Sequence, residues 1–80
     1  MPTNNTRSVS VIIPAKNEED GLSKLLPRLR AAVPHAEIIV VDDGSTDKTS
    51  EISRLNQARV LRHPYSMGKG AAIKTGARAA

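Results

Sequence analysis

The sequence has 80 residues, no cysteine and a formal net charge of +4. This length allows one small domain, and the lack of cysteine excludes disulfides and thiolate metal sites. Tyr65 is the single aromatic residue, so the sequence lacks the stacking platform that single-strand nucleic-acid binders use. We therefore expect no nucleic-acid partner. The positive charge favours simple solubility, with an anionic partner such as a phosphate group or membrane surface as the alternative.

The beginning of the chain is polar. Residues 1–7 lack the apolar centre of a secretory signal, and no apolar run approaches the roughly 20 residues that span a bilayer. We predict a flexible tail over residues 1–7 and one domain over residues 8–80. The expected location is cytoplasmic, and association with the cytoplasmic face of the membrane stays open.

The first half of the domain alternates between strand and helix. A β-branched run over residues 8–13 predicts a buried strand, which Pro14 should end because proline cannot donate to a sheet ladder. Helical spacing of leucines then predicts a helix that Asn17 caps and Pro34 ends. An apolar run over residues 37–41 predicts a second buried strand. The side chains expected on the inner face of the helix are Leu22, Leu25, Leu26, Leu29 and Val33.

The second half continues the alternation. A short helix over residues 47–56 should turn Ile52 and Leu55 inward, a third strand should centre on residues 60–61, and an Ala-rich helix over residues 69–80 could pack closely on a sheet. Short links between alternating strands and helices imply parallel strands with right-handed crossovers.

The predicted fold class is α/β. The β-α-β-α-β-α order is half of a doubly wound, Rossmann-like sheet, with strand order 3-2-1. Continuous apolar strands fit a sheet that is covered on both faces. The strand over residues 8–13 would be an open apolar edge, which predicts self-association through it, or truncation of a larger protein whose next strand lies beside it.

The loops after the first two strands are the candidate site, because ligands bind open parallel sheets at the carboxyl ends of the strands. Asp43 is the candidate that reads a base: a carboxylate there accepts hydrogen bonds from the imide of uracil or the edge of guanine. For Asp42 we favour a turn role, since Asp before Gly is common in turns.

Three further polar residues have a functional and a simpler interpretation. Glu18 either contacts a base or ribose, or compensates the helix dipole, with equal weight. Lys16 could reach a phosphate, although a solvated lysine is the simpler interpretation. Lys69, at the start of the last helix, could attract a phosphate, although a flexible loop and helix start is the favoured interpretation.

Several established site types do not fit. The first loop has no glycine, which argues against NAD binding, and the segment over residues 68–70 lacks the upstream glycine and the Ser or Thr of a phosphate loop, which excludes an ATPase site. His35 and His63 have no partners at metal-ligand spacing, and no Ser-His-Asp arrangement can be argued from the sequence. His63 is interpreted as a strand-end residue.

Three segments, in this order, resemble one family. They read Ser-Val-Ile-Ile-Pro-Ala-Lys-Asn-Glu-Glu, Ile-Ile-Val-Val-Asp-Asp-Gly-Ser-Thr-Asp and Gly-Lys-Gly-Ala-Ala-Ile. Over residues 9–80 the chain resembles the inverting glycosyltransferases of the GT-A fold (family 2 type), and is most similar to the dolichyl- and polyprenyl-phosphate sugar synthases.

The resemblance implies a site and a function. It implies a segment that binds a UDP- or GDP-sugar donor, in an enzyme that transfers a hexose to an acceptor such as polyprenyl phosphate. The nucleotide-binding residues carried over from the family's motifs are Pro14, Lys16, Glu18, Val41 and Asp43, with Lys69 as a weaker candidate. Lys16 stands where the polyprenyl-phosphate enzymes often have tyrosine.

The resemblance also implies what lies elsewhere. The family's metal-binding Asp-x-Asp and its general base come later than this chain, so we expect no catalytic or metal residue here, a Mg or Mn ion in the full enzyme, and an inactive fragment. The alternative is a non-catalytic nucleotide-binding or interaction module built on the same half-sheet. A receiver-like domain ranks last, because its acidic pair would follow the first strand.

Overall fold

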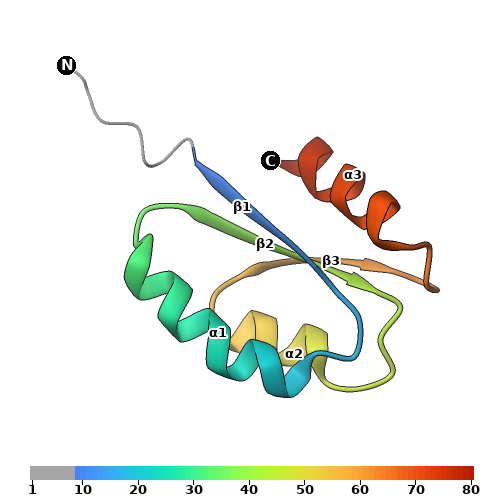
Figure 1. Ribbon diagram of the computed structural model, residues 1–80, viewed down its shortest axis with the longest axis horizontal. Coiled ribbons are helices and arrows are strands. Elements are labelled where there is room, and N and C mark those ends of the chain that lie inside the picture. Colours follow the sequence, from blue (N-terminus) through green and yellow to red (C-terminus); the bar gives the residue numbers. More distant parts are fainter. Residues whose placement is uncertain (1–8) are drawn as a thin grey trace.

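The structure, a computed structural model, describes residues 9–80 and consists of three strands and three helices in alternation. The tail predicted over residues 1–7 and the first residue of the predicted first strand lie outside this range. The elements, shown in Figure 1, are β1 (Ser10–Ala15), α1 (Glu19–Ala32), β2 (Glu37–Asp43), α2 (Thr49–Leu55), β3 (Arg59–His63) and α3 (Lys69–Ala79).

The strands form one parallel sheet in the order β1-β2-β3. This order confirms the predicted 3-2-1 arrangement. The register pairs Ala15 with Asp42 and Asp43 with His63. The carboxyl ends of all three strands therefore meet at one edge of the sheet, with the loops that follow them.

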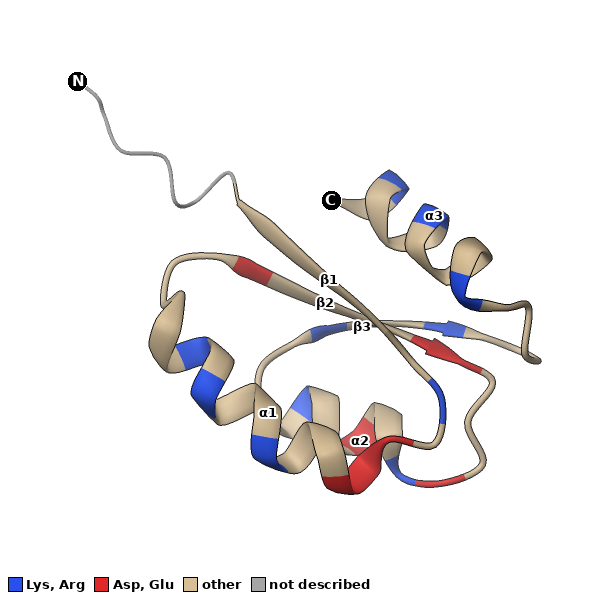
Figure 2. Ribbon diagram, in the orientation of Figure 1, with Lys and Arg blue, Asp and Glu red and all other residues tan. Residues whose placement is uncertain are grey.

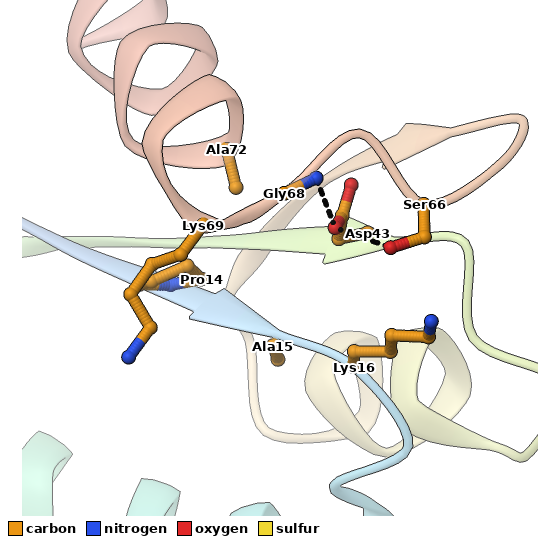
Figure 3. A pocket seen from close by; sticks show the side chains of 8 residues that line it. All are labelled: Pro14, Ala15, Lys16, Asp43, Ser66, Gly68, Lys69 and Ala72. Atoms are coloured by element: carbon orange, nitrogen blue, oxygen red, sulfur yellow. Dashed lines mark hydrogen bonds between the residues drawn. The ribbon is translucent and has the colours of Figure 1, made fainter.

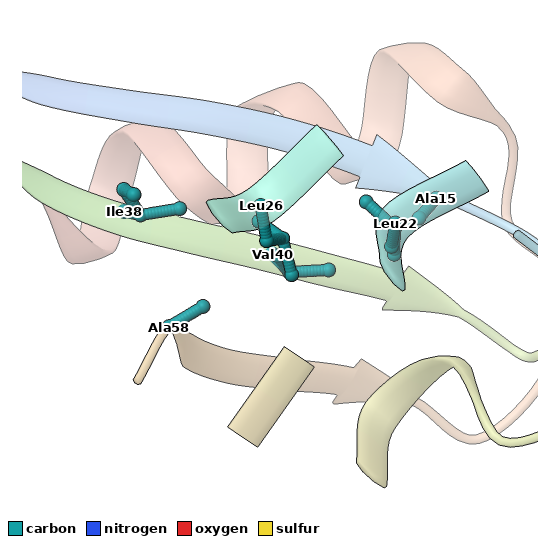
Figure 4. Close-up of a cluster of buried hydrophobic side chains, with 6 residues drawn as sticks. All are labelled: Ala15, Leu22, Leu26, Ile38, Val40 and Ala58. Atoms are coloured by element: carbon teal, nitrogen blue, oxygen red, sulfur yellow. The ribbon is translucent and has the colours of Figure 1, made fainter. Parts of the chain in front are cut away.

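Helices cover both faces of the sheet (Figure 1), as the continuous apolar strands predict. Successive residues of β2 point to opposite faces. Ile38 and Val40 pack with Leu22 and Leu26 of α1 (Figure 4), whereas Ile39 and Val41 pack against α3. Each fully buried Leu, Ile or Val contributes about 1.5–3 kcal/mol to folding.

Helix α3 lies very close to the sheet. A Cβ atom added to Gly76 would collide with the side chain of Ile12, and Ala72 is fully buried. The expectation that the Ala-rich helix packs closely is confirmed. This close approach brings the N-terminus of α3 to the carboxyl end of the sheet.

Strand β1 does not end at Pro14, as predicted, but continues to Ala15. β1 has β2 as its single neighbour within the described sheet, and proline is tolerated on such an edge because no ladder bond is lost. Strand β2 is also two residues longer than its apolar run and includes Asp42 and Asp43.

Two leucines expected to face inward are exposed. Leu25 is 45% exposed and Leu55 is 77% exposed. Leu25 lines a groove beside β1, and Leu55 is the last residue of a seven-residue helix that turns Thr49, Ser50 and Ser53 inward. The inward prediction for both leucines is therefore wrong.

Charges separate by element (Figure 2). Acidic residues gather near the carboxyl end of the sheet, including Glu19 and Asp20 in the first turn of α1. Lys and Arg lie along α1, β3 and α3. The carboxyl end of the sheet thus holds much of the negative charge, with basic residues on the neighbouring elements.

Candidate functional site

The loops that follow β1 and β2 are bonded to each other. The backbone N–H of Asn17 donates to Ser45 Oγ at 2.8 Å, and the N–H of Thr46 donates to Asn17 Oδ1 at 2.9 Å. Asn17 has φ = 53°, a left-handed conformation that asparagine tolerates. Asn17 was predicted to cap its own helix, but the N-cap of α1 is Glu18 and the Asn17 side chain instead binds the opposite loop.

Helices α1 and α2 cap each other through these loops. The N–H groups of Glu18 and Glu19 donate to Thr49 Oγ1 at 2.9 Å and to Asp47 Oδ2 at 3.2 Å. In return the N–H of Lys48 donates to Glu19 Oε1 at 3.3 Å. The Thr49 hydroxyl also donates to Asp47 and holds the pKa of that carboxyl below its usual value. The free N–H groups at these two helix starts are thus partly satisfied across the two segments, while the N–H of Thr49 donates locally to Asp47 Oδ1 at 2.9 Å.

Asp42 fixes the turn after β2, in agreement with its predicted turn role. Asp42 Oδ1 accepts from the N–H of Ser45 at 2.9 Å, and Oδ2 accepts from the hydroxyl of Ser50 and from Arg62 Nη1 at 3.3 Å. Burial by itself would raise the pKa of Asp42, but the hydrogen bonds from Ser45 and Ser50 outweigh it and keep this pKa low.

Asp43 points to the opposite face and binds the β3–α3 loop (residues 64–68). Asp43 Oδ1 accepts from His63 Nδ1 at 2.8 Å and from the Met67 N–H at 2.8 Å. Asp43 Oδ2 accepts from Ser66 Oγ at 3.0 Å and from the Gly68 N–H at 2.9 Å. The bond from His63 is the main reason that the pKa of Asp43 lies well below its usual value. An ionised carboxylate has about four acceptor positions, so protein donors fill them all.

Gly44 lets the β3–α3 loop reach this carboxylate. Its φ is +73°, and a Cβ atom at this position would lie 2.6 Å from the backbone nitrogen of Ser66 and 2.6 Å from the carbonyl carbon of Tyr65. Any larger residue would need a strained backbone and would push the loop away. Asp43 and Gly44 together hold residues 65–68 against the end of β2.

A cavity of about 230 Å³ lies between the end of β1, Asp43 and the start of α3 (Figure 3). It opens beside a groove that shares Pro14, Ala15, Lys16 and Lys69 and that Glu18 also lines. The cavity combines two ammonium groups with the N-terminus of α3, which suits an anion. The residues that line it are Pro14, Ala15, Lys16, Asp43, Ser66, Gly68, Lys69 and Ala72.

The predicted site residues fall into three groups. Pro14, Lys16, Asp43 and Lys69 line the cavity, and Glu18 lines the adjoining groove. The side chain of Val41 is fully buried under α3 instead. Contact of these residues with a nucleotide stays a prediction.

Sequence reasoning missed the partners of Asp43. His63 is the last residue of β3, as predicted, but it also joins Asp43 to Thr75, whose hydroxyl lies 2.8 Å from His63 Nε2. The sequence offered no argument for a Ser-His-Asp arrangement, and the chain that forms here ends on a threonine hydroxyl. The pairing of Asp43 with His63 across two strands was the missing signal. Thr75 is not among the residues that line the cavity, so its hydroxyl is not presented there as a nucleophile.

Two kinds of feature are absent from residues 9–80. Within them, no three His, Asp or Glu side chains converge in a way that could hold a metal ion. No helix in the same range is long and apolar enough to cross a membrane.

Comparison with known proteins identifies the family. The model of glycosyl transferase family 2 matches residues 10–80. The chain belongs to glycosyl transferase family 2. The resemblance drawn from the three motifs is thereby confirmed, and the residues that bind the two loops together, such as Asn17 and Ser45, lie inside the matched range.

Two named glycosyltransferases are similar in sequence. The chain is 50% identical over 60 residues to the 4,4'-diaponeurosporenoate glycosyltransferase of Staphylococcus haemolyticus, covering 75% of this chain and 16% of that protein. It is 38% identical over 82 residues to a dolichyl-phosphate beta-glucosyltransferase of Trichomonas vaginalis, covering 85% of this chain and 25% of that protein. The chain thus spans about a sixth to a quarter of these two relatives.

Solved glycosyltransferases share the fold. A mannosyltransferase of Pyrobaculum calidifontis in complex with GDP-Man and Mn²⁺ matches with a TM-score of 0.81 and 27% identity, over 90% of this chain and 24% of that one. Glucosyl-3-phosphoglycerate synthase of Mycobacterium tuberculosis in complex with UDP matches with a TM-score of 0.79 and 32% identity, over 92% of this chain and 30% of that one. These matches confirm the predicted Rossmann-like, GT-A type of fold.

Proposed function

We propose that this chain is the donor-binding part of a glycosyltransferase and binds a UDP- or GDP-sugar in the cavity between Lys16, Asp43 and Lys69. The observation that carries the proposal is the cavity itself. It lies at the carboxyl ends of β1 and β2 and is lined by four of the residues expected from the family motifs, Pro14, Lys16, Asp43 and Lys69. Open parallel sheets bind ligands at this edge.

The diphosphate fits the positive part of the cavity. The first backbone N–H groups of an α-helix have no intrahelical partner, and in α3 the first such bond runs from Ala72 N–H to Gly68 O. The N–H groups of residues 69–71 are therefore available to an anion, and Lys69 and Lys16 add charge. Lys16 stands where related enzymes often have tyrosine, and in this proposal it offers the diphosphate a positive charge in place of an aromatic ring.

Asp43 reads the base by exchanging one of its bonds. Its four acceptor positions are filled, but Ser66 is exposed and its hydroxyl can rotate away. The imide N–H of uracil, or the N1–H of guanine, replaces this hydroxyl at Oδ2. Glu18 lines the adjoining groove and contacts the ribose or base from there, and Val41 supports the site from beneath α3.

The proposal extends to the full-length enzyme. Similar solved glycosyltransferases hold GDP-Man with Mn²⁺, or UDP, and similar named proteins include dolichyl-phosphate and undecaprenyl-phosphate transferases. We infer transfer of a hexose to an acceptor such as polyprenyl phosphate, at the cytoplasmic membrane face. A Mg or Mn ion would neutralise the diphosphate leaving group, with ligands outside residues 9–80.

Nucleotide titration tests the site. UDP and GDP are added separately to the ¹⁵N-labelled chain, and we expect amide shifts at Lys16 and at residues 66–70 with one of them. Lys69→Gln should weaken that response and Lys24→Gln, on the exposed side of α1, should leave it unchanged. Shifts confined to other parts of the chain, or an Asp43→Ala variant that is folded and responds like the parent, would contradict the proposal.

A further inference from the structure

Asp43, His63 and Thr75 form a continuous chain from β2 through β3 to α3. Both links measure 2.8 Å, from Asp43 Oδ1 to His63 Nδ1 and from His63 Nε2 to Thr75 Oγ1. Asp43 and His63 are 5% and 7% exposed. Strands β2 and β3 and helix α3 therefore each contribute one member of this polar chain.

The partners fix the proton on the imidazole. An ionised carboxylate can only accept, so the nitrogen that faces Asp43, Nδ1, carries a hydrogen. In the neutral ring Nε2 then accepts from the Thr75 hydroxyl. One ring thus holds the Asp43 carboxylate from one side and is itself held by α3 from the other.

Asp43 in turn holds part of the cavity wall in place. Its two oxygens bind the N–H groups of Met67 and Gly68, and Gly68 is the N-cap of α3 and lines the cavity. A rotation of the carboxylate would release both N–H groups. The position of the α3 N-terminus therefore depends on the imidazole, which does not line the cavity.

We propose that His63 is a positioning residue for the donor cavity: through Nδ1–H it holds the Asp43 carboxylate in the orientation that anchors residues 67–68, with Thr75 as its support on α3. The consequence for nucleotide affinity rests on the proposed function. The consequence for the loop holds for the ligand-free chain and is tested separately.

Two substitutions of His63 separate the two links. The side-chain amide of asparagine reaches about as far as Nδ1 and can donate to Asp43, whereas that of glutamine reaches about as far as Nε2. Amide hydrogen exchange of Met67 and Gly68 is measured in the ligand-free chain. We expect His63→Asn to stay within about threefold of the parent and His63→Gln to exchange about tenfold faster, since one lost charge-assisted bond changes an opening equilibrium by about that factor.

Internal controls separate local from global opening. Exchange at Ile39 and Val40, in the buried central strand, reports global unfolding. His35→Gln changes an exposed histidine and should match the parent at every amide. Thr75→Val keeps the shape of the threonine but removes the hydroxyl that supports His63. Amide exchange at Met67 and Gly68 should therefore become about threefold faster, a smaller effect than that of His63→Gln.

Nucleotide affinity should rank the His63 variants in the same order as amide exchange. The Kd of UDP or GDP should rise about tenfold in His63→Gln and less than threefold in His63→Asn. The positioning role would be overturned by any of three results. These are equal exchange rates of Met67 and Gly68 in the two His63 variants, exchange at Ile39 and Val40 that rises as much as at Met67 and Gly68, or an Nε2–H tautomer in the imidazole ¹⁵N spectrum. Absence of UDP and GDP binding by the parent would instead overturn the proposed function, while the exchange result would still decide the role of His63.

Discussion

Asp42 and Asp43 are adjacent in sequence but bind different loops, because successive residues of a strand point to opposite faces. Asp42 binds Ser45 and Ser50 on the α2 side, and Asp43 binds the β3–α3 loop on the other side. A pair of identical residues thus fixes two separate loops. The turn role of Asp42 could be predicted from its sequence context, whereas the partners of Asp43 could not.

Replacing Asp43 by asparagine should loosen the β3–α3 loop without leaving a cavity, because the two side chains have nearly the same size. The amide nitrogen cannot accept, so Asp43→Asn loses two of the four hydrogen bonds. We expect Met67 and Gly68 to lose hydrogen-exchange protection and nucleotide affinity to fall about tenfold or more. Asp20→Asn, on the exposed start of α1, is the matched control, and equal behaviour of the two variants would contradict the anchoring role.

The acid side of the stability profile should depend on the same carboxylates. The pKa values of Asp42, Asp43 and Asp47 are all lowered in the folded chain. Their contribution to stability is therefore complete above the unfolded pKa of about 3.9 and is lost as the pH falls below it towards the folded values. Urea unfolding between pH 2.5 and 6 should show a steep decline below about pH 4, and Asp43→Asn should flatten it. A profile that declines equally in parent and variant would count against Asp43.

Gly44 should not tolerate a side chain. Gly44→Ala combines φ = +73° with a contact of 2.6 Å to the Ser66 nitrogen, and we expect a loss of about 2 kcal/mol or more in the free energy of unfolding. Gly70→Ala is the opposite case, because no atom lies within 4 Å of the added Cβ in α3; it should stabilise the chain by about 0.5–1 kcal/mol. Chemical denaturation measures both, and a neutral Gly44→Ala would contradict the close loop contact.

At the scale of elements, the two helices on one face depend on each other for their beginnings. The first turn of α1 is capped by Asp47 and Thr49, and the start of α2 by Glu19. Neither helix has a side-chain cap of its own at the N-cap position. Their formation should therefore be coupled.

Thr49→Val tests this coupling. The variant keeps the side-chain shape but removes the acceptor of the Glu18 N–H and the donor to Asp47. We expect a loss of about 1–2 kcal/mol in the free energy of unfolding, the usual effect of a lost cap, together with faster amide exchange in both α1 and α2. Ser23→Ala, whose hydroxyl binds within α1 and is exposed, should stay within about 0.5 kcal/mol. Fraying of α1 alone would rule the coupling out.

The elements were largely predictable, and the contacts between them were not. Periodicity locates all six elements, and short links imply their order and the parallel sheet. The first strand was expected to be an edge, but the exposure of Leu25 and the continuation of β1 past Pro14 depend on how α1 docks beside that edge and on the register with β2, which local patterns do not encode. Likewise, His63 and Thr75 meet Asp43 through strand register and helix docking, which are properties of the whole sheet.

At the scale of the whole molecule, β1 has β2 as its one neighbour within residues 9–80, and its other side is there an unpaired apolar edge. Leu25 of α1 lines the groove beside Ile13 and Pro14, and is 45% exposed. Ile73, 46% exposed, lies on the flank of α3 opposite Thr75, which faces β3. Apolar side chains thus border the unpaired strand on both faces, and such an edge pairs with another strand.

We expect the isolated chain to associate through β1 with a second copy. Sedimentation velocity should show a concentration-dependent shift from monomer to dimer. Leu25→Lys places a charge beside the edge on an exposed helix position and should weaken the association without loss of secondary structure, since charge at an edge opposes pairing. Lys24→Glu, one residue away, serves as a control. A monomer at every concentration would refute this expectation.

The anchoring of the β3–α3 loop divides its positions into two kinds. The backbone of Met67 and Gly68 is committed to Asp43, so a loop grafted from another family member must supply two consecutive N–H groups at the same distance from Lys69. The side chains of Tyr65 and Met67 do not take part in this anchoring and are 65% and 49% exposed in the same loop. Redesign of ligand preference can therefore vary the side chains at these two positions while the length of the loop is kept.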